Sequence, residues 1–245
     1  MSKQAEIDYF GQMSEQARDF VRRKPFSADQ RGAYLLDMGQ LLTVIRKPPA
    51  RLLDLGCGSG WTSAMFALSG YEVLGVDIAP AAIKLAGDIN AGSGARFSVC
   101  DFEALPFQNE FDIAILYDCL HHAESPGAVI SQVFKALKPG GEIAVVEPGK
   151  GHHMSTTAQQ AIRECGVTER DMPPALTRKL LMEADFRQIR TFPRVQYQLH
   201  EPEPTGRVAG LVSRLLGRSI AALAKNLKNS IMPGINGIVT AQKQA

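Results

Sequence analysis

Three glycines and one acid within the stretch Leu52–Gly60 have the types and spacing to surround a small ligand. The stretch reads Leu-Leu-Asp-Leu-Gly-Cys-Gly-Ser-Gly, and a helical pattern begins directly after it at Trp61. Glycines permit a tight turn and let bare amides approach a ligand, and a helix start adds free N–H groups. Asp54 lies inside the apolar run, where an unpaired carboxylate would be costly, so it needs a partner. We therefore expect a strand, a glycine turn and a helix that together form a binding loop.

Two more acids follow strand-like runs further along the chain. Asp77 ends the run Tyr71–Val76, and Asp101 follows the run Ala95–Cys100. The carboxyl ends of parallel strands meet at one edge of a sheet, and ligands bind there. An acid about twenty residues past the glycine turn is placed to accept hydrogen bonds from ribose hydroxyls, although Asp77 also suits a helix N-cap. Three acidic strand ends in order predict a nucleoside-type ligand.

The sequence resembles the class I (Rossmann-like) S-adenosylmethionine-dependent methyltransferase family in three features. These are the pattern Gly-x-Gly-x-Gly after Asp-Leu, the acids of the next two strands and the later turn Lys138–Gly141. The resemblance implies that Asp54 and the glycine loop hold the methionine end of the cofactor, S-adenosyl-L-methionine. It also implies that Asp77 holds the ribose and Asp101 with its neighbour the adenine. The cofactor-binding residues implied are Asp54, Gly56, Cys57, Gly58, Gly60, Asp77, Ile78, Asp101, Phe102 and Tyr117.

Two other classes of function stay open. A dinucleotide-dependent oxidoreductase would carry Gly-x-Gly-x-x-Gly, but the third glycine comes one residue early and Trp61 occupies the expected place. A non-catalytic regulatory protein would bind S-adenosylmethionine without turnover. We favour an enzyme that methylates an oxygen or nitrogen of a small molecule, with sugar and lipid-linked precursors among the compatible acceptors. The sequence does not identify the acceptor.

Strand-like and helix-like runs alternate along the chain, as a parallel α/β sheet requires. Strands are expected over residues 51–55, 71–76, 95–100, 111–116, 142–146, 187–192 and 235–240. Helices are expected over 3–23, 28–46, 79–91, 125–137 and 207–231, and from Trp61 onward. The predicted fold is one doubly wound α/β domain over 1–245, with a mostly parallel seven-stranded sheet whose last strand is antiparallel. It comprises a helical cap (1–48), a cofactor-binding core (50–148) and a helical insertion before the last strand (198–232).

The cap and the insertion are expected to cover the substrate. The insertion contains the amphipathic run 207–231, which we interpret as a lid, with contact to an anionic membrane surface as the less favoured alternative. Side chains of the cap that could line the substrate site are Tyr9, Phe10, Met13, Phe20, Tyr34 and Met38.

The loop after the fifth strand, Glu147–Met154, leaves the cofactor edge of the sheet and should face the substrate. Imidazole titrates near neutral pH, so we predict His152 as the proton acceptor, with Glu147 as its orienting partner. The alternatives are His121, His122 and Tyr117, or catalysis by alignment of the acceptor alone. The His121–His122 and His152–His153 pairs, with nearby acids, could also bind a metal ion, but neither pair has the helical i, i+4 spacing of zinc motifs, so no metal is predicted.

Composition narrows the remaining choices. The 245 residues carry a net charge of only +2, which gives no argument for nucleic acid. The four cysteines form no C-x-x-C pair and are typical of reduced thiols in the cytoplasm. No signal peptide or membrane-length apolar run is present in the sequence. We therefore expect a cytoplasmic protein with a small-molecule substrate, of unpredicted oligomeric state.

Overall fold

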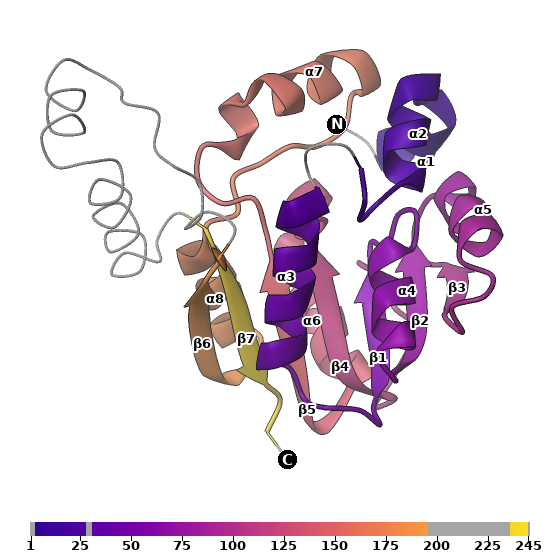
Figure 1. Cartoon of the computed structure of the whole chain (residues 1–245). Coiled ribbons are helices and arrows are strands. Elements are labelled where there is room, and N and C mark those ends of the chain that lie inside the picture. Colours follow the sequence, from indigo (N-terminus) through magenta and orange to yellow (C-terminus); the bar gives the residue numbers. More distant parts are fainter. Residues whose placement is uncertain (1–2, 28–30, 196–235, 245) are drawn as a thin grey trace, which may run out of the picture.

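A seven-stranded mixed sheet forms the centre of the computed structural model, which describes residues 3–27, 31–195 and 236–244 (Figure 1). The strand order is β3-β2-β1-β4-β5-β7-β6. The strands are β1 (Arg51–Leu55), β2 (Glu72–Asp77), β3 (Arg96–Val99), β4 (Phe111–Tyr117), β5 (Leu137–Val146), β6 (Arg187–Pro193) and β7 (Gly237–Gln242). From β3 to β5 all pairings are parallel, whereas β7 pairs antiparallel with both β5 and β6. The α/β fold and the antiparallel last strand are confirmed, and the mostly parallel sheet only in part, because β7 forms an antiparallel hairpin with β6.

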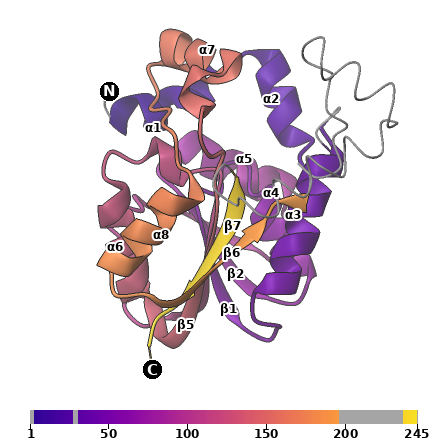
Figure 2. The ribbon, with the colours of Figure 1, turned by 90° about the vertical axis from the view of Figure 1, so that its left-hand side faces the viewer.

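Helices cover both faces of this sheet (Figures 1 and 2). The α-helices are α1 (Lys3–Gln12), α2 (Glu15–Arg22), α3 (Arg31–Val44), α4 (Trp61–Leu68), α5 (Pro80–Ile89), α6 (Pro126–Ala136), α7 (Thr156–Cys165) and α8 (Pro174–Glu183), and the short 3-10 helices are η2 (Leu120–His122) and η3 (His152–Met154). Leu52 and Ile113 pack with α3 and α4 on one face, while Leu53 and Ala114 pack with α6 and α8 on the other. The central strands β1 and β4 are therefore apolar along almost their whole length, as strands buried on both sides must be.

The helices α1, α2 and α7 lie beyond the carboxyl ends of the parallel strands in both views (Figures 1 and 2). The single helix expected over 3–23 is wrong, because the first helix ends at Gln12 and a second helix begins at Glu15. Ser14 starts the second helix by accepting a hydrogen bond from the amide of Ala17, at 3.2 Å. A serine N-cap of this kind favours a new helix over a continuous one.

Strand β5 begins earlier than the expected range 142–146. Phe111 pairs with Leu137, and Ile113 then pairs with Glu142, so the intervening residues bulge out of the ladder. Gly140, at φ +74°, makes the turn within this bulge. The Lys-Pro-Gly-Gly turn therefore lies inside the strand and not before it.

The predicted amphipathic helix 207–231 and the whole of the insertion 198–232 lie outside the described residues. Among the helices that the structure describes, none has the length and apolar character needed to cross a membrane.

Candidate active site

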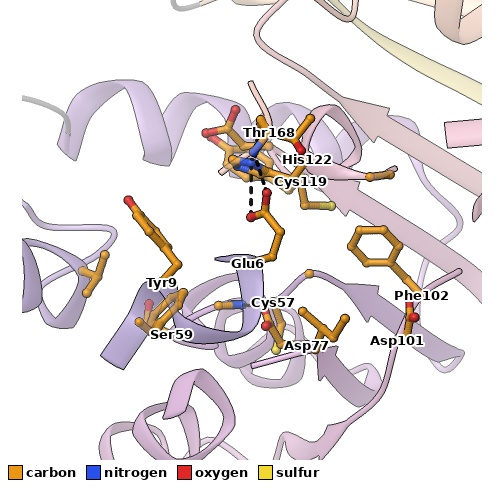
Figure 3. Close-up of a pocket in the computed structure, with 18 of the residues that line it drawn as sticks. Glu6, Tyr9, Cys57, Ser59, Asp77, Asp101, Phe102, Cys119, His122 and Thr168 are labelled. Atoms are coloured by element: carbon orange, nitrogen blue, oxygen red, sulfur yellow. Dashed lines mark hydrogen bonds and ion pairs between the residues drawn. The ribbon is translucent and has the colours of Figure 1, made fainter. Parts of the chain in front are cut away.

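A cavity of about 270 Å³ opens at the carboxyl edge of β1, β2 and β4 (Figure 3). All of the predicted cofactor-binding residues except Asp54 and Gly60 line it. Those on the sheet side are Gly56, Cys57, Gly58, Asp77, Ile78, Asp101, Phe102 and Tyr117. The lining residues from α1, α2 and the turns that follow them are Lys3, Glu6, Tyr9, Phe10, Met13, Val21 and Lys24. The cavity therefore lies between the sheet edge and the N-terminal helices.

The glycine loop turns through left-handed backbone conformations that favour glycine. Gly56 has φ +62°, Gly58 has φ +53°, and Gly60, at φ +74°, is the residue before α4. Gly58 borders the cavity opposite Phe10 of α1, whose ring carbon would lie 3.3 Å from an added β-carbon. Gly60 serves packing instead, because an added β-carbon would lie 2.6 Å from the ring of Phe97. Only the first two glycines expose bare backbone to the cavity.

Asp54 is buried beneath the loop and does not line the cavity. One of its carboxylate oxygens accepts hydrogen bonds from the hydroxyls of Thr62 and Ser63, both at 2.6 Å. Burial raises the pKa of Asp54 to about 6, against the lowering effect of these two hydrogen bonds. The acid thus ties the end of β1 to the first turn of α4 and fixes the shape of the loop from below.

This burial predicts a pH dependence of stability. The pKa of Asp54 in the folded protein lies above its ordinary value of 3.8, so protonation of Asp54 stabilises the folded state. This contribution to the free energy of unfolding is fully present below pH 3.8 and is lost as the pH rises through about 6. Lowering the pH from 7 to 5 should therefore stabilise the native protein relative to Asp54→Asn by about 1 kcal/mol. Urea unfolding of both proteins at the two pH values measures this, with the exposed Asp88→Asn as control. A stability difference that does not change with pH would contradict the assignment.

Asp77 ends β2 and holds the glycine loop from the side. Its two oxygens accept one amide each, from Gly58 at 3.0 Å and from Ala79 at 2.9 Å. Burial raises the pKa of Asp77, and these two amides oppose the rise. A carboxylate oxygen can accept more than one hydrogen bond, so the group keeps capacity for a ligand in the cavity. The helix-cap and ligand roles that the sequence left open are therefore compatible.

Asp101 carries a partner that the sequence did not reveal. One oxygen accepts the amide of Glu103 at 2.8 Å, and the other lies 2.6 Å from Nζ of Lys3, at the start of α1. The ring of the next residue, Phe102, lines the cavity. The N-terminal helix is thus anchored at the part of the site where the resemblance implies the adenine.

The N-terminal helices supply part of the predicted lining. Tyr9, Phe10 and Met13 line the cavity, but Met38 is buried in the core beneath. Phe20 and Tyr34 instead contact the ammonium group of Lys24, whose Nζ lies 5.8 and 5.1 Å from the two ring centres. Lys24 itself lines the cavity. Phe20 and Tyr34 therefore position the Lys24 side chain at the cavity and do not line the cavity themselves.

Glu6 and Thr168 complete the wall opposite the glycine loop (Figure 3). Glu6 reaches from α1, accepts the amide of Thr168 at 2.7 Å, and lies 3.7 Å from Nδ1 of His122. Burial raises the pKa of Glu6 to about 6. Sequence reasoning missed Glu6, although it lies three and four residues before Tyr9 and Phe10 and so shares their helix face.

Tyr117 lines the cavity and is fixed by a buried ion pair. Its hydroxyl donates to Asp37 at 2.7 Å, and Asp37 is also paired with the guanidinium of Arg194. The Tyr117 ring meets the Trp61 ring edge to face, with centres 5.3 Å apart. This network joins α3 to β4 and to the residue that follows β6.

The predicted pairing of His152 with Glu147 is wrong. Glu147 is buried and accepts Nδ1–H of His121 at 2.7 Å as well as the amides of Cys119 and Leu120. His152 instead lies 2.7 Å from Glu169, through its Nε2. Neither predicted residue is among those that line the cavity, because Glu147 closes back onto the turn after β4. The proton-acceptor role of His152 stays a prediction without support from the geometry.

The histidine that faces the cavity is His122. Burial and the neighbouring His121 lower the pKa of His122 to about 4. Burial also acts to lower the pKa of His121, but the carboxylates of Glu147 and Glu169 raise it to about 10. The two ring centres lie 4.0 Å apart, so a charge on His121 disfavours protonation of His122.

Part of the chain is similar in sequence to known methyltransferases. Residues 53–145 match the family described as a methyltransferase domain. The ubiquinone biosynthesis O-methyltransferases of Idiomarina loihiensis and Pseudomonas fluorescens are 35% and 32% identical to this chain over 97 residues. The matched region is 38% of this chain and 40% and 42% of the two relatives. The chain therefore spans about two fifths of the length of the curated relatives it matches.

Solved structures share the fold over most of the chain. One chain of a Haloferax volcanii complex, between the Trm112 methyltransferase activator and a methyltransferase, matches with a TM-score of 0.64 and 16% identity. The match covers 88% of this chain and 92% of the matched chain. Phosphoethanolamine N-methyltransferase 2 of Haemonchus contortus, in complex with S-adenosyl-L-methionine, matches with a TM-score of 0.59 and 18% identity, over 93% and 60%. At these identities the likeness concerns the fold alone.

A methyltransferase domain therefore matches the central part of this chain, and the fold is like that of solved methyltransferase structures. The matched structure of phosphoethanolamine N-methyltransferase 2 contains S-adenosyl-L-methionine. The residues around the cavity fit that cofactor. Gly56 and Gly58 line the cavity with backbone, Asp77 keeps acceptor capacity toward it, and Phe102 offers an apolar ring.

Proposed function

We propose that this protein transfers a methyl group from S-adenosyl-L-methionine to an oxygen or nitrogen of a small molecule. The observation that carries the proposal is the cavity itself, which has the glycine loop and Asp77 on one side and α1 with Lys24 on the other. A cavity bounded by both can hold a cofactor against the sheet and an acceptor under the helices. The names of the relatives favour an oxygen acceptor, and sugar or lipid-linked precursors remain compatible.

The proposed roles follow from where each residue lies. The backbone from Gly56 to Gly58 lies beside the methionine part, Asp77 accepts from the ribose hydroxyls, and Phe102 with Asp101 meets the adenine. The cofactor supplies an activated sulfonium methyl for direct displacement. The chain contributes alignment and the exclusion of water, and such positioning can supply most of the acceleration in a bimolecular transfer. The apolar side chains of α1 and α2 serve this exclusion.

A transfer assay with a deuterated methyl donor tests the proposal. The protein is incubated with S-adenosylmethionine carrying a CD₃ group and an extract of small metabolites, and products are identified by mass spectrometry. We expect a labelled small molecule that depends on the protein and is lost with Asp77→Ala. A folded, cofactor-binding protein that labels only protein or nucleic acid, or nothing, would refute small-molecule methylation.

The affinity for S-adenosylhomocysteine, the demethylated cofactor, tests the role of Asp77. The native protein should bind it in the micromolar range, roughly −8 kcal/mol. Asp77→Ala should weaken binding by about 1.5–3 kcal/mol, because it removes a charged acceptor from the ribose hydroxyls. Calorimetry measures both values, with Asp88→Ala, an exposed acid paired with Lys84, as the matched control. Equal affinity in folded Asp77→Ala and native protein would remove this assignment.

A further inference from the structure

Three side chains from distant parts of the sequence converge beside the cavity in a way that suits a metal ion. His121 and His122 belong to η2, directly after β4, and Glu169 lies in the loop after α7. One potential ligand atom from each lies within 4.8 Å of the other two. His121 is buried, and the side chains of His122 and Glu169 are 28% and 9% exposed, so the cluster is nearly enclosed.

Both histidines are oriented by acceptors that hold one ring nitrogen. Nδ1 of His121 lies 2.7 Å from a carboxylate oxygen of Glu147, and Nδ1 of His122 lies 2.7 Å from the carbonyl oxygen of Thr168. A carbonyl only accepts, so Nδ1 of His122 carries a proton, and Nε2 is the nitrogen that this ring offers to a ligand. Metal-binding histidines are held in this way, by a carboxylate or carbonyl on the nitrogen that does not bind the metal.

The carboxylates of Glu169 and Glu147 lie on opposite nitrogens of the His121 ring. Nε2 of His121 lies 3.4 Å from Oε2 of Glu169, so the nitrogen not held by Glu147 points at the third member of the cluster. The same oxygen of Glu169 lies 2.7 Å from Nε2 of His152. Glu147 is itself fixed by the amides of Cys119 and Leu120. Two imidazoles and a carboxylate, with an outer carboxylate locked by backbone, form a donor set suited to zinc and its neighbours.

We propose that His121, His122 and Glu169 bind a divalent transition-metal ion at the acceptor side of the cavity. Three protein ligands leave a fourth position open, which is the arrangement of catalytic zinc sites. His122 and Thr168 line the cavity, so the open position faces the space left for the acceptor. There the ion would hold an oxygen or nitrogen lone pair of the acceptor. That acceptor role rests on the proposed function, whereas metal binding itself does not.

Titration of the metal-free, tag-free full chain with Co²⁺ tests the site, because Co²⁺ in a four-coordinate site gives a visible absorption spectrum. We expect one Co²⁺ per chain, displaced by Zn²⁺. Glu169→Gln keeps the shape of the side chain but removes a charged ligand, and should weaken Co²⁺ binding by roughly 100-fold or more. The matched control is Asp171→Asn, a nearby acid paired with His153 outside the cluster, which should bind Co²⁺ like the native chain. Glu147→Gln, which weakens the hold on Nδ1 of His121, should weaken binding by roughly 10- to 100-fold.

The absence of saturable binding in the folded native protein would overturn the proposal and leave the cluster as an ion-pair network. Binding that survives in both Glu169→Gln and His122→Ala would also overturn it, since the ion would then lie elsewhere. S-adenosylhomocysteine affinity is measured in the same preparations. Intact cofactor binding without metal binding would defeat only the metal site, and the reverse result would defeat only the proposed function.

Discussion

Replacing Gly58 by valine should remove S-adenosylmethionine binding while the protein remains folded. Gly58 has φ +53°, which a branched side chain adopts only with strain, and it borders the cavity. Its β-carbon would point toward Phe10, 3.3 Å away, so the valine side chain would fill the space between the loop and α1. Strain and lost space together should weaken binding by roughly 100-fold or more. Calorimetry with S-adenosylhomocysteine and far-UV circular dichroism measure the two parts of this result.

Gly92→Val is the control for this prediction. Gly92 lies outside the left-handed region, and an added β-carbon meets nothing within 4 Å. This variant should bind the cofactor product with native affinity. If Gly58→Val also binds normally, the loop does not approach the ligand and the placement of the cofactor is wrong.

Asp37→Ala should lower the free energy of unfolding by about 3–5 kcal/mol, the range seen when one partner of a buried ion pair is removed. Asp37 is fully buried, and its carboxylate accepts both the guanidinium of Arg194 and the hydroxyl of Tyr117. Truncation leaves a buried cation without its carboxylate. Urea unfolding measures the change, and the weakened Tyr117 wall should also reduce cofactor affinity.

The control for this second prediction is Asp19→Ala. Asp19 is exposed and pairs with Arg23 on the helix surface, so its loss should change the free energy of unfolding by less than about 1 kcal/mol. Arg194→Met in the Asp37→Ala background should restore part of the lost stability, because it removes the buried positive charge that Asp37 balances. Similar losses in Asp37→Ala and Asp19→Ala would show that the ion pair does not support the fold.

The sequence predicted the parts of the site that depend on residues close together along the chain. The glycine spacing after β1 predicted the loop, and the acids that end β2 and follow β3 were correctly placed at one sheet edge, because parallel strands bring their carboxyl ends together. The resemblance implied that Asp54 holds the methionine end of the cofactor, but its carboxylate is buried and faces the start of α4. Which side an acid faces depends on the helix packed against it.

The residues that sequence reasoning missed are paired over long distances. Glu169 follows Glu147 by more than a full helix, and nothing in its local pattern marks it as a partner of His121. Arg194 meets Asp37 across 157 positions of sequence. Such contacts depend on how the loops close over the sheet edge, and a single sequence contains no spacing rule for them. The helix break at Ser14 is different. A serine N-cap is a local signal, so the sequence alone could have predicted this break.

A crystal structure with S-adenosylhomocysteine tests the central claim most directly. We expect one molecule in the cavity between the glycine loop and α1, with its ribose hydroxyls on the carboxylate of Asp77 and its adenine against Phe102. The amino-acid part should lie beside Gly56 and Gly58. A folded protein that takes up no ligand at this edge of the sheet, or holds it away from Asp77 and the loop, would contradict the account.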